Sequence, residues 1–409
     1  GIFVGATTSS GMMDIARHGI FTPNFYSFND VMCIFLAVAA TDVILMDIFN
    51  TLGMPTSTTV SMVFGLLGGS TALAMTKIWG GQYTYEQLIN TDKALQVIIA
   101  IFLSVAIAFV FGLVVMWITR IIFTFNYKKH LRWTIALFGG VGATSIFYFL
   151  IVSGLKGSNL LKDLGVSDWI DQNHGLLLLY CFCIFTVLAE VLHLLKVNIF
   201  KIIVLFGTFS LAMAFFGNDL VNFIGTPLAG LESFLDFTHN GNGEAAKSYT
   251  MDVLAGESAL PYKHLFLLAA GILLSTPAAV CTSKKAHKVV QTTVNLSRQD
   301  EGEEVFSSSR IARKTVRSVL NTTNAVSRYI PNNVKSWINT RFNSEEATLD
   351  DGVAFDLVRA SVNLVLAGLL IVVGTTLQLP LSTTYVAFMV AMGSSLADRA
   401  WGRETAVYR

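Results

Sequence analysis

Residues 215–230 read FFGNDLVNFIGTPLAG, and they lie inside an apolar region that runs from residue 199 to residue 235. Three polar side chains, those of Asn218, Asp219 and Asn222, interrupt this apolar sequence. A carboxylate in hydrocarbon costs about 2.5–3.5 kcal/mol, so an acid persists there mainly where it has a partner or faces a cavity. The neighbouring glycines and Pro227 allow a membrane helix to break, which frees carbonyl groups for a cation. The stretch predicts a broken helix around a polar site; the alternative is a polar turn between two helices.

The composition surrounding this stretch is that of a membrane protein. Of the 409 residues 53% are hydrophobic and 13% are charged, whereas soluble domains carry about 25% charged residues. The net charge of +1 and the absence of an acidic or basic tail give no indication of a nucleic-acid partner. The four cysteines have no metal-site spacing, and no metal is expected beyond a sodium ion.

Nine apolar segments predict an all-α integral membrane protein. A spanning helix needs about 20 residues, whereas strands of a membrane barrel are about ten residues long and alternate. The predicted segments are residues 31–50, 57–75, 94–118, 134–152, 175–193, 199–235, 264–280, 354–375 and 382–397. The opening apolar stretch is too short to span, and the chain stops soon after an apolar segment, so we expect a fragment that lacks at least one N-terminal helix.

A five-residue motif occurs twice, as PTSTT at residues 55–59 and as PLSTT at residues 380–384. Each copy follows a predicted span and leads into an apolar segment. Lys and Arg gather in the loop 120–133 and at the start of the insertion 282–353, which places both loops inside. When the membrane crossings of the predicted spans are counted from these loops, the helix before the first copy starts outside and the helix before the second copy starts inside. The two copies therefore have opposite orientations in the membrane. The sequence thus predicts an inverted-repeat secondary transporter with broken or re-entrant helices and a site near the midplane.

The repeated motif suits the binding of a tetrahedral oxyanion. After each proline, Ser57 and Ser382 take the N-cap or the first turn of a helix. A helix N-terminus offers unpaired N–H groups and a partial positive charge, to which the threonine hydroxyls add donors. Ordinary N-capping explains one hydroxyl in each copy but not three.

Acids and amides in the apolar segments provide candidates for a coupling ion. Asn218, Asp219 and Asn222 supply hard oxygen ligands for a small monovalent cation, and Asp219 can also take a proton. Asp47 is an additional candidate because it lies near the first Ser-Thr-Thr copy. The alternative for Asp47 is an ion pair with a basic residue such as Arg359.

These motifs resemble those of the inorganic phosphate transporter (PiT) family, which carries a Gly-Ala-Asn-Asp-x-x-Asn stretch and a Pro-x-Ser-Thr-Thr loop in each half. The resemblance implies uptake of inorganic phosphate driven by sodium or protons. No HExxH, GxSxG or P-loop motif occurs in the sequence, so we expect no enzymatic activity and no cofactor besides the coupling ion. The resemblance also implies phosphate binding by Ser57, Thr58, Thr59, Ser382, Thr383 and Thr384. It assigns the coupling cation to Asn218, Asp219 and Asn222.

The sequence departs from the family pattern at three places. The Asn-Asp signature of the first half is missing, and we expect it upstream of Gly1. Val60 and Tyr385 stand where the family commonly has histidine, and Phe216-Gly217 precedes Asn218 in place of Gly-Ala. The last two departures bear on the coupling ion more than on the substrate.

We expect five regions along the chain. They are a first repeat at 1–133, connecting helices at 134–198, the start of the second repeat at 199–281, a basic cytoplasmic loop at 282–353 and the end of the second repeat at 354–409.

The residues alone leave alternatives to phosphate symport in a cell membrane. Hydroxyls and amides bind sulfate or another oxyanion equally well, and a non-transporting receptor or a channel is a further alternative. The sequence does not give the oligomeric state, for which a homodimer is one choice. The partners expected here are inorganic phosphate and the lipid bilayer.

Overall fold

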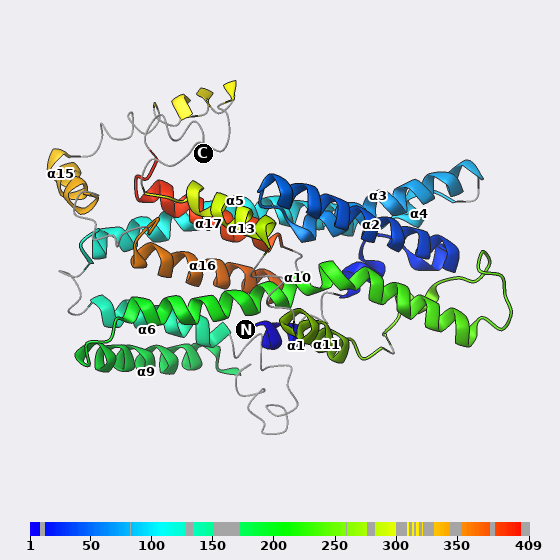
Figure 1. Cartoon of the computed structure of the whole chain (residues 1–409), viewed down its shortest axis with the longest axis horizontal. Coiled ribbons are helices and arrows are strands. Elements are labelled where there is room, and N and C mark those ends of the chain that lie inside the picture. Colours follow the sequence, from blue (N-terminus) through cyan, green and yellow to red (C-terminus); the bar gives the residue numbers. More distant parts are fainter. Residues whose placement is uncertain are drawn as a thin grey trace.

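Each of the nine predicted segments coincides with one helix in the computed structural model of the chain (Figure 1). The structure describes residues 1–8, 13–81, 83–127, 134–149, 172–258, 260–275, 283–299, 331–343, 353–376 and 381–401, with a few isolated positions between 309 and 321. Most of the 282–353 insertion lies outside the described residues. No regular strand occurs within the described ranges, so the predicted all-α class is confirmed.

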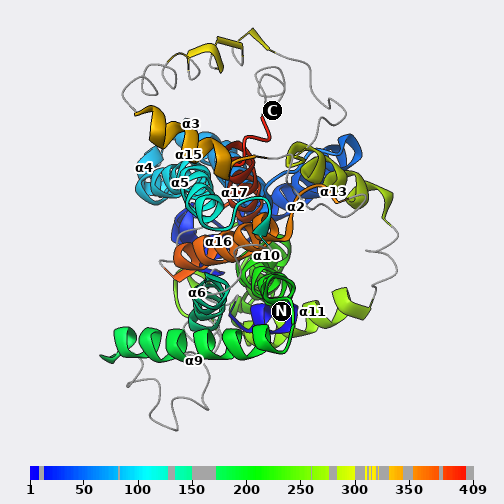
Figure 2. The same ribbon diagram turned by 90° about the vertical axis from the view of Figure 1, so that its left-hand side faces the viewer.

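Most of the long helices run nearly along one direction, α9 (His174–Leu194) lies across that direction in the end-on view, and short elements join them (Figures 1 and 2). The long helices are α2 (Phe28–Leu52), α3 (Thr58–Trp79), α5 (Thr91–Phe123), α6 (Thr134–Phe149), α9 (His174–Leu194), α10 (Ile199–Asn240), α11 (Tyr262–Ser275), α16 (Leu357–Thr376) and α17 (Thr383–Ala397). The short elements are α1 (Ile2–Thr8), η2 (Ile15–Gly19), η3 (Pro23–Phe25), α4 (Tyr85–Leu88), η6 (Asp252–Ala255), α13 (Lys284–Leu296) and α15 (Asn332–Arg341).

The outer surface of the bundle is apolar, as in a protein surrounded by lipid. Six helices of the described chain are long and apolar enough to cross a membrane. Large apolar side chains point outward from them, and Leu36, Phe102 and Leu205 are 72%, 68% and 71% exposed. Soluble proteins rarely expose apolar faces of this extent. The chain is therefore a multi-pass integral membrane protein.

Helix α10 is the central element, and it is continuous. Its 42 residues span about 63 Å at 1.5 Å per residue, and the end-on view places it within the bundle beside α16 (Figure 2). The predicted break in residues 199–235 is wrong, because the helix continues through Pro227. A proline removes one backbone hydrogen bond, and tight packing supports the helix there, since Thr226 and Ala229 are buried.

Helices α2 and α3 form a hairpin, called hairpin 1 below, whose turn holds the first Ser-Thr-Thr copy. A Cβ on Gly65 would lie 3.3 Å from Val38, and one on Gly69 would lie 3.6 Å from Ile34, so the two helices pack closely and antiparallel. Gly53 ends α2 with φ of 72°, a left-handed conformation that favours glycine. Ser57 caps α3 by accepting a hydrogen bond from Val60 N–H. These two signals place the turn where the sequence predicts it.

Hairpin 1 approaches from the C-terminal end of α10. The ring of Phe28 stacks on that of Phe237 with centroids 4.4 Å apart, and Phe35 lies against Gly230. Residue numbers therefore rise along α2 as they fall along α10. The hairpin enters from this end and brings its turn to the middle of α10.

Helices α16 and α17 form hairpin 2, which approaches from the opposite end. The hydroxyl of Ser361 donates to the carbonyl of Phe200 at 3.4 Å, and a Cβ on Gly207 would lie 2.8 Å from Leu364. Residue numbers thus rise together along α16 and α10. The two hairpins have opposite orientations about α10, which is the predicted inverted repeat.

A helix of the first half packs closely on hairpin 2. Where α5 crosses α17, a Cβ on Gly112 would lie 2.6 Å from the carbonyl oxygen of Val390, and one on Gly393 would lie 2.2 Å from that of Phe109. Small residues allow membrane helices to approach closely, because van der Waals packing drives their association. The two glycines therefore set the distance between α5 and α17.

A buried arginine holds the open end of hairpin 2. Arg120 of α5 contacts Asp356 at 2.7 Å, just before α16, and Asp398 at 2.5 Å, just after α17. The arginine side chain is fully buried, and it also donates to the carbonyl of Thr124 at 2.9 Å. Paired in this way, the three charges join α5 to both ends of the hairpin.

A second buried arginine lies near the opposite end of α10. Arg17 of η2 contacts Glu232 of α10 at 2.9 Å and donates to the carbonyl oxygens of Val253 and Gly256. The hydroxyl of Tyr262 donates to the same glutamate at 2.5 Å. Charged and fully bonded groups therefore fasten both ends of the bundle.

We predict that Gly393→Ala lowers the stability of the folded protein. The new methyl group would collide with the Phe109 carbonyl, and overpacking of this kind costs about 1–3 kcal/mol. The change should lower the apparent Tm in detergent. The control is Gly68→Ala on α3, where a Cβ meets no atom within 4 Å. An unchanged Tm for Gly393→Ala would show that α5 and α17 are not in close contact.

Candidate functional site

The polar residues of α10 lie at its middle, on a face that the hairpins cover. Asn218, Asp219 and Asn222 are 1%, 9% and 5% exposed. The amide groups of Asn218 and Asn222 donate to Oδ1 of Asp219 at 3.0 and 3.2 Å. One turn of helix thus gathers a carboxylate and two amides, as the spacing of the motif predicts.

The turn of hairpin 1 contacts this group through its threonines. The amide nitrogen of Asn222 lies 3.1 Å from Oγ1 of Thr58 and 2.9 Å from Oγ1 of Thr59. Ser57 is 2% exposed and occupies the N-cap of α3. The N-terminus of α3 is therefore directed at the middle of α10.

The turn of hairpin 2 contacts the same group from the other side. The hydroxyl of Thr383 donates to Oδ2 of Asp219 at 2.5 Å. Ser382 is fully buried and caps α17 by accepting from Tyr385 N–H at 3.3 Å. Thr384 lies in the same first turn and is partly buried. A second helix N-terminus therefore meets α10 opposite the first.

The carbonyl group of Leu381 joins the two turns. It accepts from the amide of Asn218 at 3.1 Å and from the hydroxyl of Thr59 at 2.9 Å. Thr59 and Leu381 are 322 residues apart in the sequence. The two Ser-Thr-Thr copies are thus in direct contact, and the site contains residues of both repeats.

The acid of this site has neutral partners, whereas the acids at the ends of the bundle are paired with arginines. The contacts that the structure describes for Asp219 come from one hydroxyl and two amides, all neutral. The side-chain oxygen Oδ1 of Asn218 is buried without a hydrogen-bond partner among the described residues. Neutral donors and oxygen ligands side by side can bind an anion together with a small cation.

Asp47 does not face this site, and the prediction that it contributes is wrong. It forms a 2.5 Å ion pair with Lys285 of α13, and its side chain is 64% exposed. Arg359, the partner that the sequence offered as the alternative, instead donates to the carbonyl of Ser297 at 2.8 Å. The reason is that Asp47 lies on the face of α2 that packs against α13.

Sequence reasoning missed two contacts at or near the site. The carbonyl group of Leu381 has no sequence signal, because every residue carries one. The second contact joins Asp42 of α2 to the hydroxyl of Ser61 on α3. An acid in an apolar segment was its only signal.

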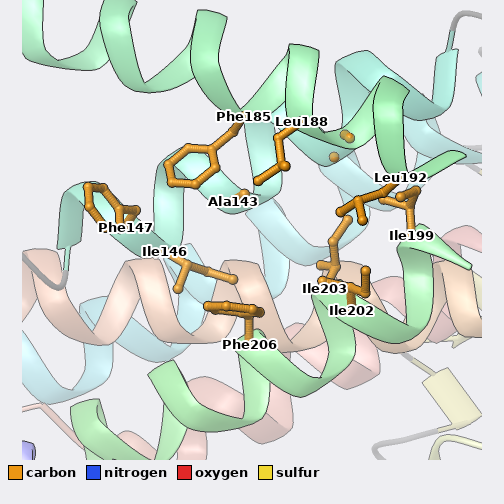
Figure 3. Close-up of a pocket in the computed structure, with 12 residues that line it drawn as sticks. Ala143, Ile146, Phe147, Phe185, Leu188, Leu192, Ile199, Ile202, Ile203 and Phe206 are labelled. Carbon is orange, nitrogen blue, oxygen red and sulfur yellow. The ribbon is translucent and has the colours of Figure 1, made fainter. Parts of the chain in front are cut away.

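Two cavities of the described chain lie away from the site and are apolar. One of about 250 Å³ lies between α6, α9 and α10, where Phe147, Phe185 and Phe206 surround it with aliphatic side chains (Figure 3). A second, of about 580 Å³, lies between α5, α6 and α16. The walls of both cavities are almost entirely apolar, so neither cavity suits an anion, and the contact of the two turns with α10 is the candidate site.

Comparison with known proteins identifies the family of the chain. The phosphate transporter family, PHO4, matches residues 2–295, which is more than half of the chain. A solved structure described as the sodium-dependent phosphate transporter is similar with a TM-score of 0.57 and 15% identity, covering 97% of this chain and 78% of that one. At this identity the likeness shows a shared fold. Among curated proteins no sequence matches. The chain belongs to the phosphate transporter family.

Proposed function

We propose that the chain imports inorganic phosphate across a cell membrane by symport with a cation, sodium or a proton. The anion would bind to Ser57, Thr58, Thr59, Ser382, Thr383 and Thr384, and the cation to Asn218, Asp219 and Asn222. The proposal rests on one observation, which is that both Ser-Thr-Thr turns contact the same Asn-Asp-x-x-Asn residues in the middle of α10. In secondary transporters, inverted repeats place the substrate between the two halves.

The donors at the two turns support binding of an oxyanion. Ser57 and Ser382 accept hydrogen bonds as caps, which uses lone pairs of their oxygens and leaves each O–H able to donate. The N-termini of α3 and α17 add backbone N–H groups and their partial positive charge. Phosphate would therefore be held by neutral donors from both repeats.

The carboxylate of Asp219 supports a requirement for a cation. An ionised carboxylate beside phosphate raises the free energy of the site through Coulomb repulsion, and its described contacts are all neutral. A sodium ion or a proton at this group removes the repulsion. Each ion then lowers the cost of burying the other, which is a physical basis for symport. The description of the similar structure as sodium-dependent supports sodium.

The direct test is uptake into vesicles that contain the purified protein. Sodium and pH gradients are imposed separately, and accumulation of labelled phosphate is measured with each. Competition by sulfate tests selectivity, because monohydrogen phosphate can donate a proton to an acceptor and sulfate cannot. Uptake that ignores both gradients would identify a channel, and no uptake at all would contradict the proposal.

We predict that Asp219→Asn abolishes gradient-driven phosphate uptake while the protein still inserts into the membrane. The amide keeps the shape of the side chain but can neither hold a proton nor neutralise a cation. The control is Asp236→Asn on the same helix, where the carboxylate accepts from Asn240 and Tyr249 far from the site. Wild-type uptake by Asp219→Asn would remove Asp219 from the mechanism.

We predict that Ser57→Ala and Ser382→Ala each weaken apparent phosphate affinity. Loss of one donor costs about 1 kcal/mol, which raises KM roughly fivefold. Ser70→Ala is the control, because Ser70 is also buried on α3 but donates to the carbonyl of Leu66. If both site variants keep the wild-type KM and lose only thermal stability, the hydroxyls serve as caps alone.

A further inference from the structure

Asp42 lies inside the contact between the two helices of hairpin 1. Along this contact Ile34 faces Gly69 and Val38 faces Gly65, so the next position on α2 faces the next turn of α3. Those residues are Asp42 and Ser61, and the serine hydroxyl bonds to the carboxylate. Of these three successive contacts, the one closest to the turn of the hairpin therefore contains a carboxylate in place of an apolar side chain.

This pair lies one helical turn from the Ser-Thr-Thr residues. Ser61 donates its backbone N–H to the carbonyl of Ser57 at 3.1 Å, and the adjacent Thr58 and Thr59 bond to Asn222 of α10. A change in the charge of Asp42 acts on the first turn of α3. That turn is the part of hairpin 1 that touches the site.

Hairpin 2 has no such acid at the matching position. Counted from the proline of each motif, Asp42 corresponds to Ala367 and Ser61 to Val386. Both are apolar and buried, at 2% and 1% exposure. Hairpin 2 therefore shows that the two helices of such a hairpin can pack without an acid at this position. Asp42 is partly buried. A carboxylate is costly in hydrocarbon, so its presence in only one of the two repeats indicates a role other than packing.

The other charged groups near α2 either have partners of their own or are exposed. On α2, Asp30 pairs with Lys77 of α3 at 2.8 Å and Asp47 pairs with Lys285 of α13. On α10, Asp219 receives bonds from Thr383, Asn218 and Asn222. On α13, Lys288 packs with its Cβ against Gly53, and Lys284 and His287 are exposed. The described contact of Asp42 is with a neutral hydroxyl.

We propose that Asp42 is a proton-binding site whose protonation couples a pH gradient to movement of hairpin 1. The proton would come from water on one side of the membrane, form an O–H bond on the carboxylate, and return to water on the other side. A proton suits this site better than a metal ion, because one hydroxyl is too few ligands and no group of three or more His, Cys, Asp or Glu residues gathers in the described part of the chain. The inference rests on the proposed phosphate transport.

The test compares two transport modes in vesicles that contain the purified protein. Accumulation of labelled phosphate is measured with an imposed pH gradient, and phosphate–phosphate exchange is measured at equal pH on both sides. For Asp42→Asn we expect accumulation to fall to the level seen without a gradient while exchange continues at the wild-type rate. Asp42→Glu should restore accumulation. Asp47→Asn is the matched control on the same helix and should behave as wild type.

The outcomes separate this inference from the proposed function. Unchanged pH-driven accumulation in Asp42→Asn overturns the inference, and so does a wild-type protein that responds only to sodium. Loss of exchange together with accumulation also overturns it, because Asp42 would then support the structure of the hairpin. If the wild type transports no phosphate under either gradient, the proposed function itself fails.

Discussion

The carboxylate of Asp219 is buried at the middle of α10, where the hydroxyl of Thr383 and the amides of Asn218 and Asn222 donate to it. A buried carboxylate is costly unless such donors surround it. The threonine comes from hairpin 2, and Asn222 also holds the threonines of hairpin 1. This one group therefore requires both hairpins, entering from opposite ends, to place their turns at the same level of α10.

The distribution of charge along the bundle fits a molecule that changes conformation at its centre. At the two ends, Arg17 and Arg120 form buried ion pairs with Glu232, Asp356 and Asp398. Breaking such a pair by losing one partner costs about 3–5 kcal/mol. Near the turns the donors are neutral hydroxyls and amides, and each of their bonds contributes about 1–3 kcal/mol. The ends are thus fastened strongly, while the centre can exchange its bonds for those of a ligand.

The helix caps, Pro227 and the acids of α2 show which features the sequence predicts and which it does not. The helices and caps follow from hydropathy and local signals, so Ser57 and Ser382 lie at the N-caps where the motif predicts them. Pro227 and its neighbouring glycines predicted a break in α10 that does not occur, because packing from both sides keeps the helix continuous. Asp47, which the sequence offered as a candidate, is exposed beside Lys285, whereas Asp42 of the same helix bonds to Ser61.

The sequence by itself determined the membrane class, the positions of the spans and the inverted repeat, and it supplied the candidates for the site. It could do so because hydropathy, capping and a repeated motif are local properties of the chain. Only the tertiary structure decided which of these residues meet. The contact between Thr59 and the carbonyl of Leu381 joins positions 322 residues apart. Such a contact depends on how two hairpins pack on α10, and no local pattern records that packing.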